Sequence, residues 1–159
     1  MISHARLLEL LSYDPLTGFF AWRQDRPGHV KAGDCAGSLK KDGYISINVD
    51  GRRYKAHRLA WFYVHGRWPN GDLDHRSLNR AENWIANLRE GTRSQNMGNI
   101  RAHSGLKGVS FDSRRGQWRA RIKDGEKERW LGYWPTADAA HAAYTKAAAD
   151  VFGEFARAE

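Results

Sequence analysis

The chain has 159 residues, 41% of them hydrophobic, which suffices for one ordinary core or for two or three small modules. Its 26 Lys and Arg outnumber 18 Asp and Glu, and the net charge of +8 favours nucleic acid or an anionic membrane surface as the partner. No apolar run approaches the roughly 20 residues that span a bilayer, and the first residues do not resemble a secretory signal. The single cysteine, Cys35, excludes an internal disulfide and a cysteine-rich zinc site, so we expect an intracellular protein stabilised by packing.

The first segment, residues 1–53, is predicted to be a β-rich region that follows a short helix. Leucines crowded on one side of a seven-residue stretch predict the helix, and Asp50-Gly51 is a strong hairpin turn between two strands. The predicted elements are a helix at 6–12, strands at 19–22, 44–49 and 52–57, and a Gly- and Lys-rich loop at 26–41.

The second segment, residues 54–100, is predicted to run from a buried helix into a strand, a polar loop, a second strand and a final helix. Thr92 can cap the final helix, which carries Asn96 on its second turn. The predicted elements are a helix at 59–64, strands at 73–75 and 85–88, and a helix from residue 93.

Residues 101–107 are predicted to form a basic linker to the third segment, residues 108–156. Three stretches have the composition of β-strands, and the turn-forming pairs Arg115-Gly116 and Asp124-Gly125 separate them. Thr136 is a good cap for an alanine-rich helix that can lie close against a sheet. The predicted elements are strands at 109–112, 117–123 and 129–133, and a helix that runs to about residue 151.

The central segment carries groups that could cut a phosphodiester. Asp74 offers a carboxylate and Asn96 an amide oxygen, which are ligands that suit one hard cation, Mg²⁺ or Mn²⁺. His75 can accept a proton from water at neutral pH, and Asn87 on the facing strand could hold its ring. Each residue alone is common in polar loops, but all four fall in one strand–loop–strand–helix unit of a basic protein.

A family resemblance rests on the stretch HRLAW and on a run of motif positions after it. The stretch is at 57–61, and the later positions are Asp74-His75, Asn83, Asn87-Leu88, Arg89, Thr92 and Asn96. Together they closely resemble the HNH endonucleases, in the version found in phage and intron-encoded homing enzymes. The resemblance implies a ββα-metal unit in which Asp74 and Asn96 bind the metal, His75 is the general base and Asn87 orients that base.

The sequence departs from the family pattern in the loop after the base. Arg76-Ser77-Leu78 stands where members often have Ile-Asn-Gly, so the geometry of this turn is open, although no catalytic group is lost. We interpret His57 as a structural or phosphate-facing residue rather than as a catalytic one. Asn at the last motif position implies a hard cation rather than zinc.

The third segment has the pattern of a surface that contacts DNA. In residues 117–123, Trp118, Ala120 and Ile122 alternate with polar side chains, so one face of the strand can pack on the helix. The other face can either present Arg to a groove of DNA or remain a charged face in contact with solvent. The segment from Gly108 to about Phe152 resembles the DNA-binding domain of plant ethylene-response transcription factors. The resemblance implies DNA contacts by Arg114, Arg115, Arg119, Arg121, Lys123 and Trp130.

The sequence therefore predicts an α+β protein with a β-hairpin-rich N-terminal region, a central ββα-metal unit and a C-terminal three-stranded antiparallel sheet packed on one helix. The first segment also resembles the leader of phage-type HNH proteins, and its basic residues could extend the DNA footprint: Lys40, Lys41, Arg52 and Arg53. We expect a monomer that acts on double-stranded DNA, nicks one strand per binding event, and has no membrane partner and no small-molecule substrate. Alternatives are a DNA-binding protein without catalysis, such as a regulator or a degenerate mobile-element remnant, and, less favoured, an RNA-binding protein.

Overall fold

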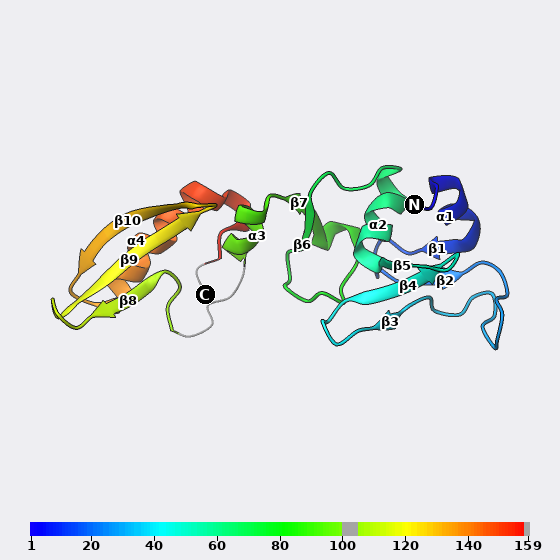
Figure 1. Cartoon of the computed structure of the whole chain (residues 1–159), viewed down its shortest axis with the longest axis horizontal. Coiled ribbons are helices and arrows are strands. Elements are labelled where there is room, and N and C mark those ends of the chain that lie inside the picture. The colour runs from blue at the N-terminus through cyan, green and yellow to red at the C-terminus, as the bar shows by residue number, and fades with distance from the viewer. Residues whose placement is uncertain (100–104, 158–159) are drawn as a thin grey trace. The chain divides into compact units, whose positions relative to one another are not determined.

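A computed structural model describes residues 1–99 and 105–157, and the chain forms two compact units, Met1–Glu90 and Gly91–Glu159 (Figure 1). Helices are mixed with small sheets, so the α+β class is confirmed. The predicted linker at 101–107 falls largely outside the described residues. Within the described part of the chain, no helix is both long and apolar enough to cross a membrane.

The first unit combines two helices and a short 3-10 turn with three small sheets, whose strand orders are β1-β2, β3-β4-β5 and β6-β7. Its elements are α1 His4–Leu10, β1 Leu11–Tyr13, β2 Phe20–Trp22, β3 Ser38–Leu39, β4 Ile45–Val49, β5 Arg52–Lys55, α2 Ala56–His65, β6 Asp72–His75, η1 Ile85–Asn87 and β7 Leu88–Gly91.

The helix α1 begins and ends two residues earlier than the sequence predicts. Ser3 Oγ accepts a hydrogen bond from the Arg6 amide and caps the helix. After Leu10 the chain becomes extended, because Leu11 pairs with Trp22 in the β1-β2 sheet and is fully buried there.

The hairpin between β4 and β5 forms as predicted, since Asp50 and Gly51 both have positive φ, of 48° and 75°, and join Val49 to Arg52. The return strand ends earlier than predicted, at Lys55, because α2 begins at Ala56. A third strand, β3, lies within the stretch that was predicted to be a loop.

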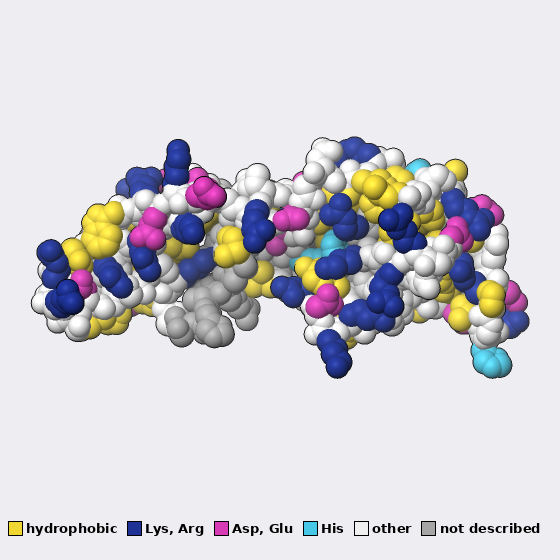
Figure 2. Space-filling view, viewed as in Figure 1, with side chains coloured by type: hydrophobic (Ala, Val, Ile, Leu, Met, Phe, Trp, Pro, Cys, Tyr) yellow, Lys and Arg dark blue, Asp and Glu magenta, His cyan; other side chains and the backbone are white. Residues whose placement is uncertain are grey.

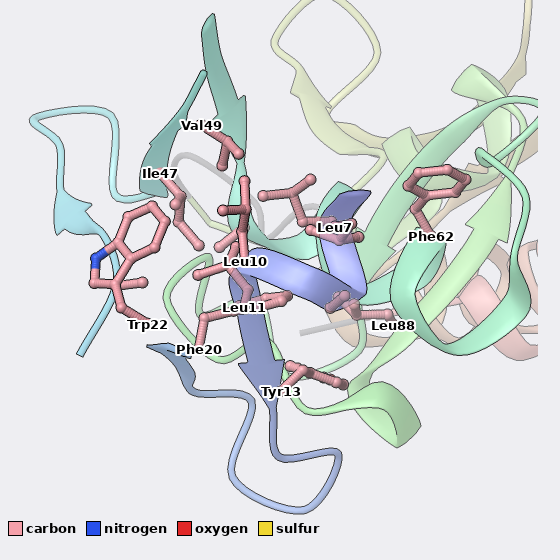
Figure 3. Close-up of a cluster of buried hydrophobic side chains, with 14 residues drawn as sticks. Leu7, Leu10, Leu11, Tyr13, Phe20, Trp22, Ile47, Val49, Phe62 and Leu88 are labelled. Carbon is pink, nitrogen blue, oxygen red and sulfur yellow. The ribbon is translucent and has the colours of Figure 1, made fainter. Parts of the chain in front are cut away.

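One hydrophobic cluster joins the helices and strands of the first unit, including the helix that carries His57 and the strand that carries Arg89. Leu7, Leu10 and Leu11 contribute from α1 and β1, and their side chains lie with Phe20, Ile47 and Val49 (Figure 3). The cluster also includes Leu59 and Ala60 of α2 and Leu88 of β7. Both the helix that carries His57 and the strand that carries Arg89 are therefore attached to the core.

The second unit is an antiparallel sheet, in the order β10-β9-β8, with helix α4 against one face (Figure 1). Ala140, Ala147 and Ala148 are buried on α4, and these small side chains allow the helix to lie close to the strands. Thr136 caps α4 as predicted, by accepting from the Ala139 amide. The elements are α3 Arg93–Asn99, β8 Val109–Asp112, β9 Gln117–Asp124, β10 Lys127–Trp134, α4 Ala137–Phe152 and η2 Gly153–Phe155.

Candidate active site

The strand β6 separates the side chains of Asp74 and His75, because successive residues of a strand point to opposite faces. Leu73 and His75 are buried, whereas Asp74 is partly exposed. The chain then turns at once, and the Leu78 amide donates to the His75 carbonyl at 2.9 Å. Leu78 has a φ of 66°, in the region that favours glycine, at a cost of about 1–2 kcal/mol. The turn therefore forms despite the missing glycine, with backbone strain.

His75 is held by Asn83, a residue to which the sequence assigned no chemical role. The His75 Nε2 and Asn83 Oδ1 atoms are 3.3 Å apart, and both side chains are buried. Asn83 donates its own amide to the Ala81 carbonyl, which orients its oxygen toward the ring. Because an amide oxygen can only accept, this contact places the proton of a neutral imidazole on Nε2 and the lone pair on Nδ1.

Asn87 lies on the short turn η1 rather than on the predicted strand at 85–88, and its amide holds the loop after β6. Its oxygen accepts from the Ser77 amide at 2.9 Å, and its nitrogen donates to Ser77 Oγ and to the Glu82 carbonyl. The structure therefore connects Asn87 to the loop that carries Asn83, which in turn contacts His75.

Two aromatic rings pack beside His75. The ring of His57, the second residue of α2, lies edge-on with a centroid distance of 5.1 Å, and the Tyr44 ring lies at 6.0 Å. His57 is buried, and its Nδ1 has no hydrogen-bond partner among the described residues. Burial lowers the pKa of His57 to about 3, and the charges of Lys55, of Arg58 and of His75 in its protonated form act in the same direction. His57 is therefore neutral at pH 7.

The electrostatics of His75 also favour a neutral ring. Burial lowers the pKa of His75, while the hydrogen bond to Asn83 and the charge of Asp74 act in the opposite direction. The lowered pKa means that the unprotonated form predominates at neutral pH. A neutral imidazole can accept a proton from water, which is the property that a general base needs.

Asp74 forms a buried ion pair that the sequence did not indicate. Arg89, on the neighbouring strand β7, donates through Nη2 and Nε to Asp74 Oδ2 at 2.8 and 2.9 Å. Only 7% of the Arg89 side chain and 12% of the Asp74 side chain are exposed. The guanidinium thus compensates the carboxylate charge and holds it in one orientation.

Asn96 belongs to the second unit, where it lies on α3. The N-terminus of this helix has a reciprocal cap, in which Thr92 Oγ1 accepts from the Gln95 amide and Gln95 Oε1 accepts from the Thr92 amide. The predicted cap at Thr92 is confirmed. The Oδ1 atom of Asn96 is buried and has no hydrogen-bond partner among the described residues.

An unpaired buried carbonyl oxygen costs about 1–3 kcal/mol, and a cation is one partner that removes the cost. Each residue taken by itself is a donor of the type that suits a hard cation: Asp74 offers a carboxylate, and Asn96 offers an amide oxygen for which the described residues supply no hydrogen-bond partner.

A comparison with known protein families gives a match within the part of the chain that carries these residues. Residues 54–98 match the family model of the HNH endonucleases. The matched HNH segment contains Asp74, His75, Asn87 and Asn96, and it supports a nuclease of the HNH family that acts on DNA. No curated protein matches the chain.

The basic residues that the sequence assigned to DNA contacts lie on exposed turns and strands of both units. In the first unit they are Lys40, Lys41, Arg52 and Arg53, all exposed. In the second unit Arg114 and Arg115 occupy the turn between β8 and β9, and the Arg115 guanidinium stacks 4.7 Å from the Tyr133 ring centre. Figure 2 shows Lys and Arg side chains spread over the visible face, interspersed with acidic ones.

The side chains of β9 alternate as predicted. Ala120 and Ile122 are buried, whereas Arg121 and Lys123 are exposed. Two of the arginines already have partners within the sheet: Arg119 donates to Ser110 Oγ at 2.7 Å, and Arg121 pairs with Glu128 at 3.2 Å. Trp130, directly opposite Arg121 on β10, is 51% exposed.

Proposed function

We propose that the chain is a metal-dependent DNA endonuclease of the homing type. The observation that carries the proposal is the environment of His75, a neutral imidazole held by Asn83 inside the segment that matches the HNH model. In the proposal His75 is the general base, Asn87 supports it through the loop, and Asp74 and Asn96 hold one Mg²⁺ or Mn²⁺ ion.

The residues divide the work of hydrolysis among them. His75 Nδ1 accepts a proton from water while the water oxygen bonds to phosphorus. The bond from phosphorus to one ester oxygen breaks, and that oxygen leaves with a proton taken from a solvent water molecule. When bound, the cation offsets the charge that develops on the phosphate and on the leaving oxygen. Arg89 keeps the Asp74 carboxylate in place for this role.

The basic flanks would supply affinity for double-stranded DNA. The resemblance of the second unit to ethylene-response-factor domains supports contacts by Arg119, Arg121, Lys123 and Trp130, with Arg114 and Arg115 near the backbone. Lys40, Lys41, Arg52 and Arg53 would extend the footprint from the first unit. One HNH segment provides one active centre, so a monomer would nick a single strand in each binding event.

The ion pair between Asp74 and Arg89 favours a second candidate, a DNA-binding protein without catalysis. An arginine that already neutralises a carboxylate competes with a cation for it, as expected in a regulator or in the remnant of a mobile element. The neutral, well-held His75 favours the nuclease, because a binding protein has no need for a buried base.

A plasmid assay separates the two candidates. Supercoiled plasmids that carry DNA from the source genome are incubated with the protein and Mg²⁺ or Mn²⁺, alongside a chelator control. We expect nicked circles only with metal, and a rate at least about 100-fold lower for His75→Ala. Arg67→Ala, which alters an exposed residue of the same unit, serves as the matched control and should cut normally.

DNA binding without any cleavage in either metal would support the non-catalytic candidate. Linear product that appears without a nicked intermediate would contradict nicking.

A further inference from the structure

The helix that carries Asn96 is held by the sheet-and-helix module of the second unit. Ser94, in the first turn of α3, donates to Asp124 Oδ1 at 2.6 Å and accepts from the Gly125 amide at 3.1 Å. Asp124 is the last residue of β9, and Gly125 begins the turn from β9 to β10. These two bonds attach the start of α3 directly to the hairpin whose strands carry Arg121 and Lys123.

The other end of α3 packs on the C-terminal helix without an intervening side chain. Gly98 is buried, and a Cβ placed on it would lie 2.6 Å from the ring of Phe152, the last residue of α4. A Cβ on Gly91 would lie 2.7 Å from the ring of Phe155 and 2.6 Å from Asn96 Oδ1. The two glycines therefore let α3 approach the aromatic rings, and Gly91 also leaves room for the Asn96 amide.

The last carbonyls of α3 have partners in the same module. Lys107 Nζ donates to the Gly98 carbonyl at 2.6 Å, and the Arg157 amide donates to the same oxygen at 3.3 Å. Helix ends otherwise leave such carbonyls to water. Burial lowers the pKa of Lys107, in keeping with an amine drawn into the protein surface.

A helix of seven residues is not stable by itself, because its few hydrogen bonds do not offset the entropy lost in nucleation. The Thr92 cap contributes about 1 kcal/mol, which is too little for independent folding. The helical state of α3, and with it the orientation of Asn96, must therefore depend on the contacts with the β9–β10 turn and with α4.

We propose that Ser94, Gly98 and Phe152 are positioning residues through which the C-terminal module presents Asn96 to the metal. The inference rests on the proposed role of Asn96 as a ligand. It assigns the C-terminal module a second task beside DNA contact, since the same hairpin that offers basic side chains to DNA also holds the helix of the metal ligand.

The test compares Ser94→Ala with Thr145→Ala in the full chain. Thr145→Ala is a matched control, because it removes a hydroxyl bond within α4 away from α3. We expect Ser94→Ala to speed hydrogen exchange of amides 96–99 about fivefold or more, without a change in β8 and β9. The Mn²⁺ concentration for half-maximal nicking should rise at least about threefold, while the rate at saturating Mn²⁺ stays near that of the parent protein.

Phe152→Leu provides a second variant that keeps a large apolar side chain and should show the same two effects. Unchanged exchange of amides 96–99 in both variants would overturn the proposal. Faster exchange with an unchanged Mn²⁺ requirement would overturn it as well, since α3 would then be held without effect on the ligand.

The two arms distinguish this proposal from the proposed function. If the parent protein does not nick DNA, the metal role of Asn96 fails, and hydrogen exchange still decides whether the module holds α3. If the parent protein nicks DNA and both variants match it in both readouts, only the positioning role fails.

Discussion

At the scale of single residues, the largely buried pair of Asp74 and Arg89 has a large expected effect on stability. Most of both side chains is shielded from water, and the hydrogen bonds between them are 2.8 and 2.9 Å long. Removal of one member takes the ion-pair partner away from a charge that is largely shielded from water, which costs more than the loss of an exposed pair.

We therefore expect Arg89→Ala to lower the free energy of unfolding by about 3–5 kcal/mol. Arg67→Ala is the matched control in the same unit, because it breaks the exposed pair with Glu90 and should cost no more than about 1 kcal/mol. Urea denaturation of the three proteins measures the difference. Equal losses for the two variants would contradict the assigned burial of the Asp74 pair.

His57 contributes a dependence of stability on pH. Its pKa is about 3 in the folded protein and near 6.5 when unfolded, so the unfolded chain binds more protons between these values. His57 therefore does not reduce the free energy of unfolding above about pH 6.5, and it reduces that free energy progressively as the pH falls from 6.5 toward 3.

Between pH 7 and pH 5, His57 should reduce the free energy of unfolding by up to roughly 2 kcal/mol. In His57→Phe, which keeps a ring beside His75, that part of the loss should disappear, and any part due to the lowered pKa of His75 should remain. Urea denaturation at the two pH values gives the comparison. A loss of the same size in both proteins would show that His57 titrates normally.

Leu78 shows where sequence reasoning at a single position was incomplete. Because the sequence lacks the usual glycine, it did not predict the conformation of the turn after His75. In the structure the turn forms, with Leu78 at positive φ. The sequence can indicate that such a backbone conformation is disfavoured. Whether the surroundings enforce it depends on the Asn87 and Ser77 bonds that hold the loop.

At the scale of elements, strand β9 combines correct alternation with partners that the pattern could not indicate. The exposed face carries Arg121 and Lys123, but Glu128 of β10 pairs with Arg121. The acidic neighbour reduces the positive charge available to a phosphate, so the face is a weaker anion-binding surface than its Arg and Lys content indicates.

We expect Glu128→Gln to tighten DNA binding severalfold, because it removes a repulsive charge and releases Arg121. Lys123→Ala should weaken binding and reduce the slope of log affinity against log salt by about 0.9, the value for one lost phosphate contact. Asp150→Asn is the control, because it also removes one negative charge, at an exposed residue of α4. Salt titrations of DNA binding measure all three, and equal tightening by Asp150→Asn would contradict a specific role for Glu128.

At the scale of the whole molecule, the two units share the residues of the proposed chemistry. The HNH match runs from 54 to 98 and thus crosses the boundary between Glu90 and Gly91. The proposed base His75, the residue proposed to support it and the proposed carboxylate ligand belong to the first unit, and the proposed amide ligand Asn96 belongs to the second. The surplus of basic residues is likewise distributed over both units, so each unit by itself carries a net positive charge.

The sequence by itself determined the α+β class, the hairpin at Asp50-Gly51, the caps of α3 and α4, and the alternation of β9. These features depend on interactions between residues close together in the chain, which local patterns describe well. The motif spacing also led to the HNH segment that the family match supports.

Only the tertiary structure decided which side chains meet. Asn83 contacts His75 across eight positions, Arg89 pairs with Asp74 across the β6-β7 sheet, and Ser94 reaches Asp124 thirty positions away. Such contacts depend on the packing of elements and on the burial of charge, which no local pattern records. For the same reason the short helix α3 could be predicted from its cap, while the module that holds it could not.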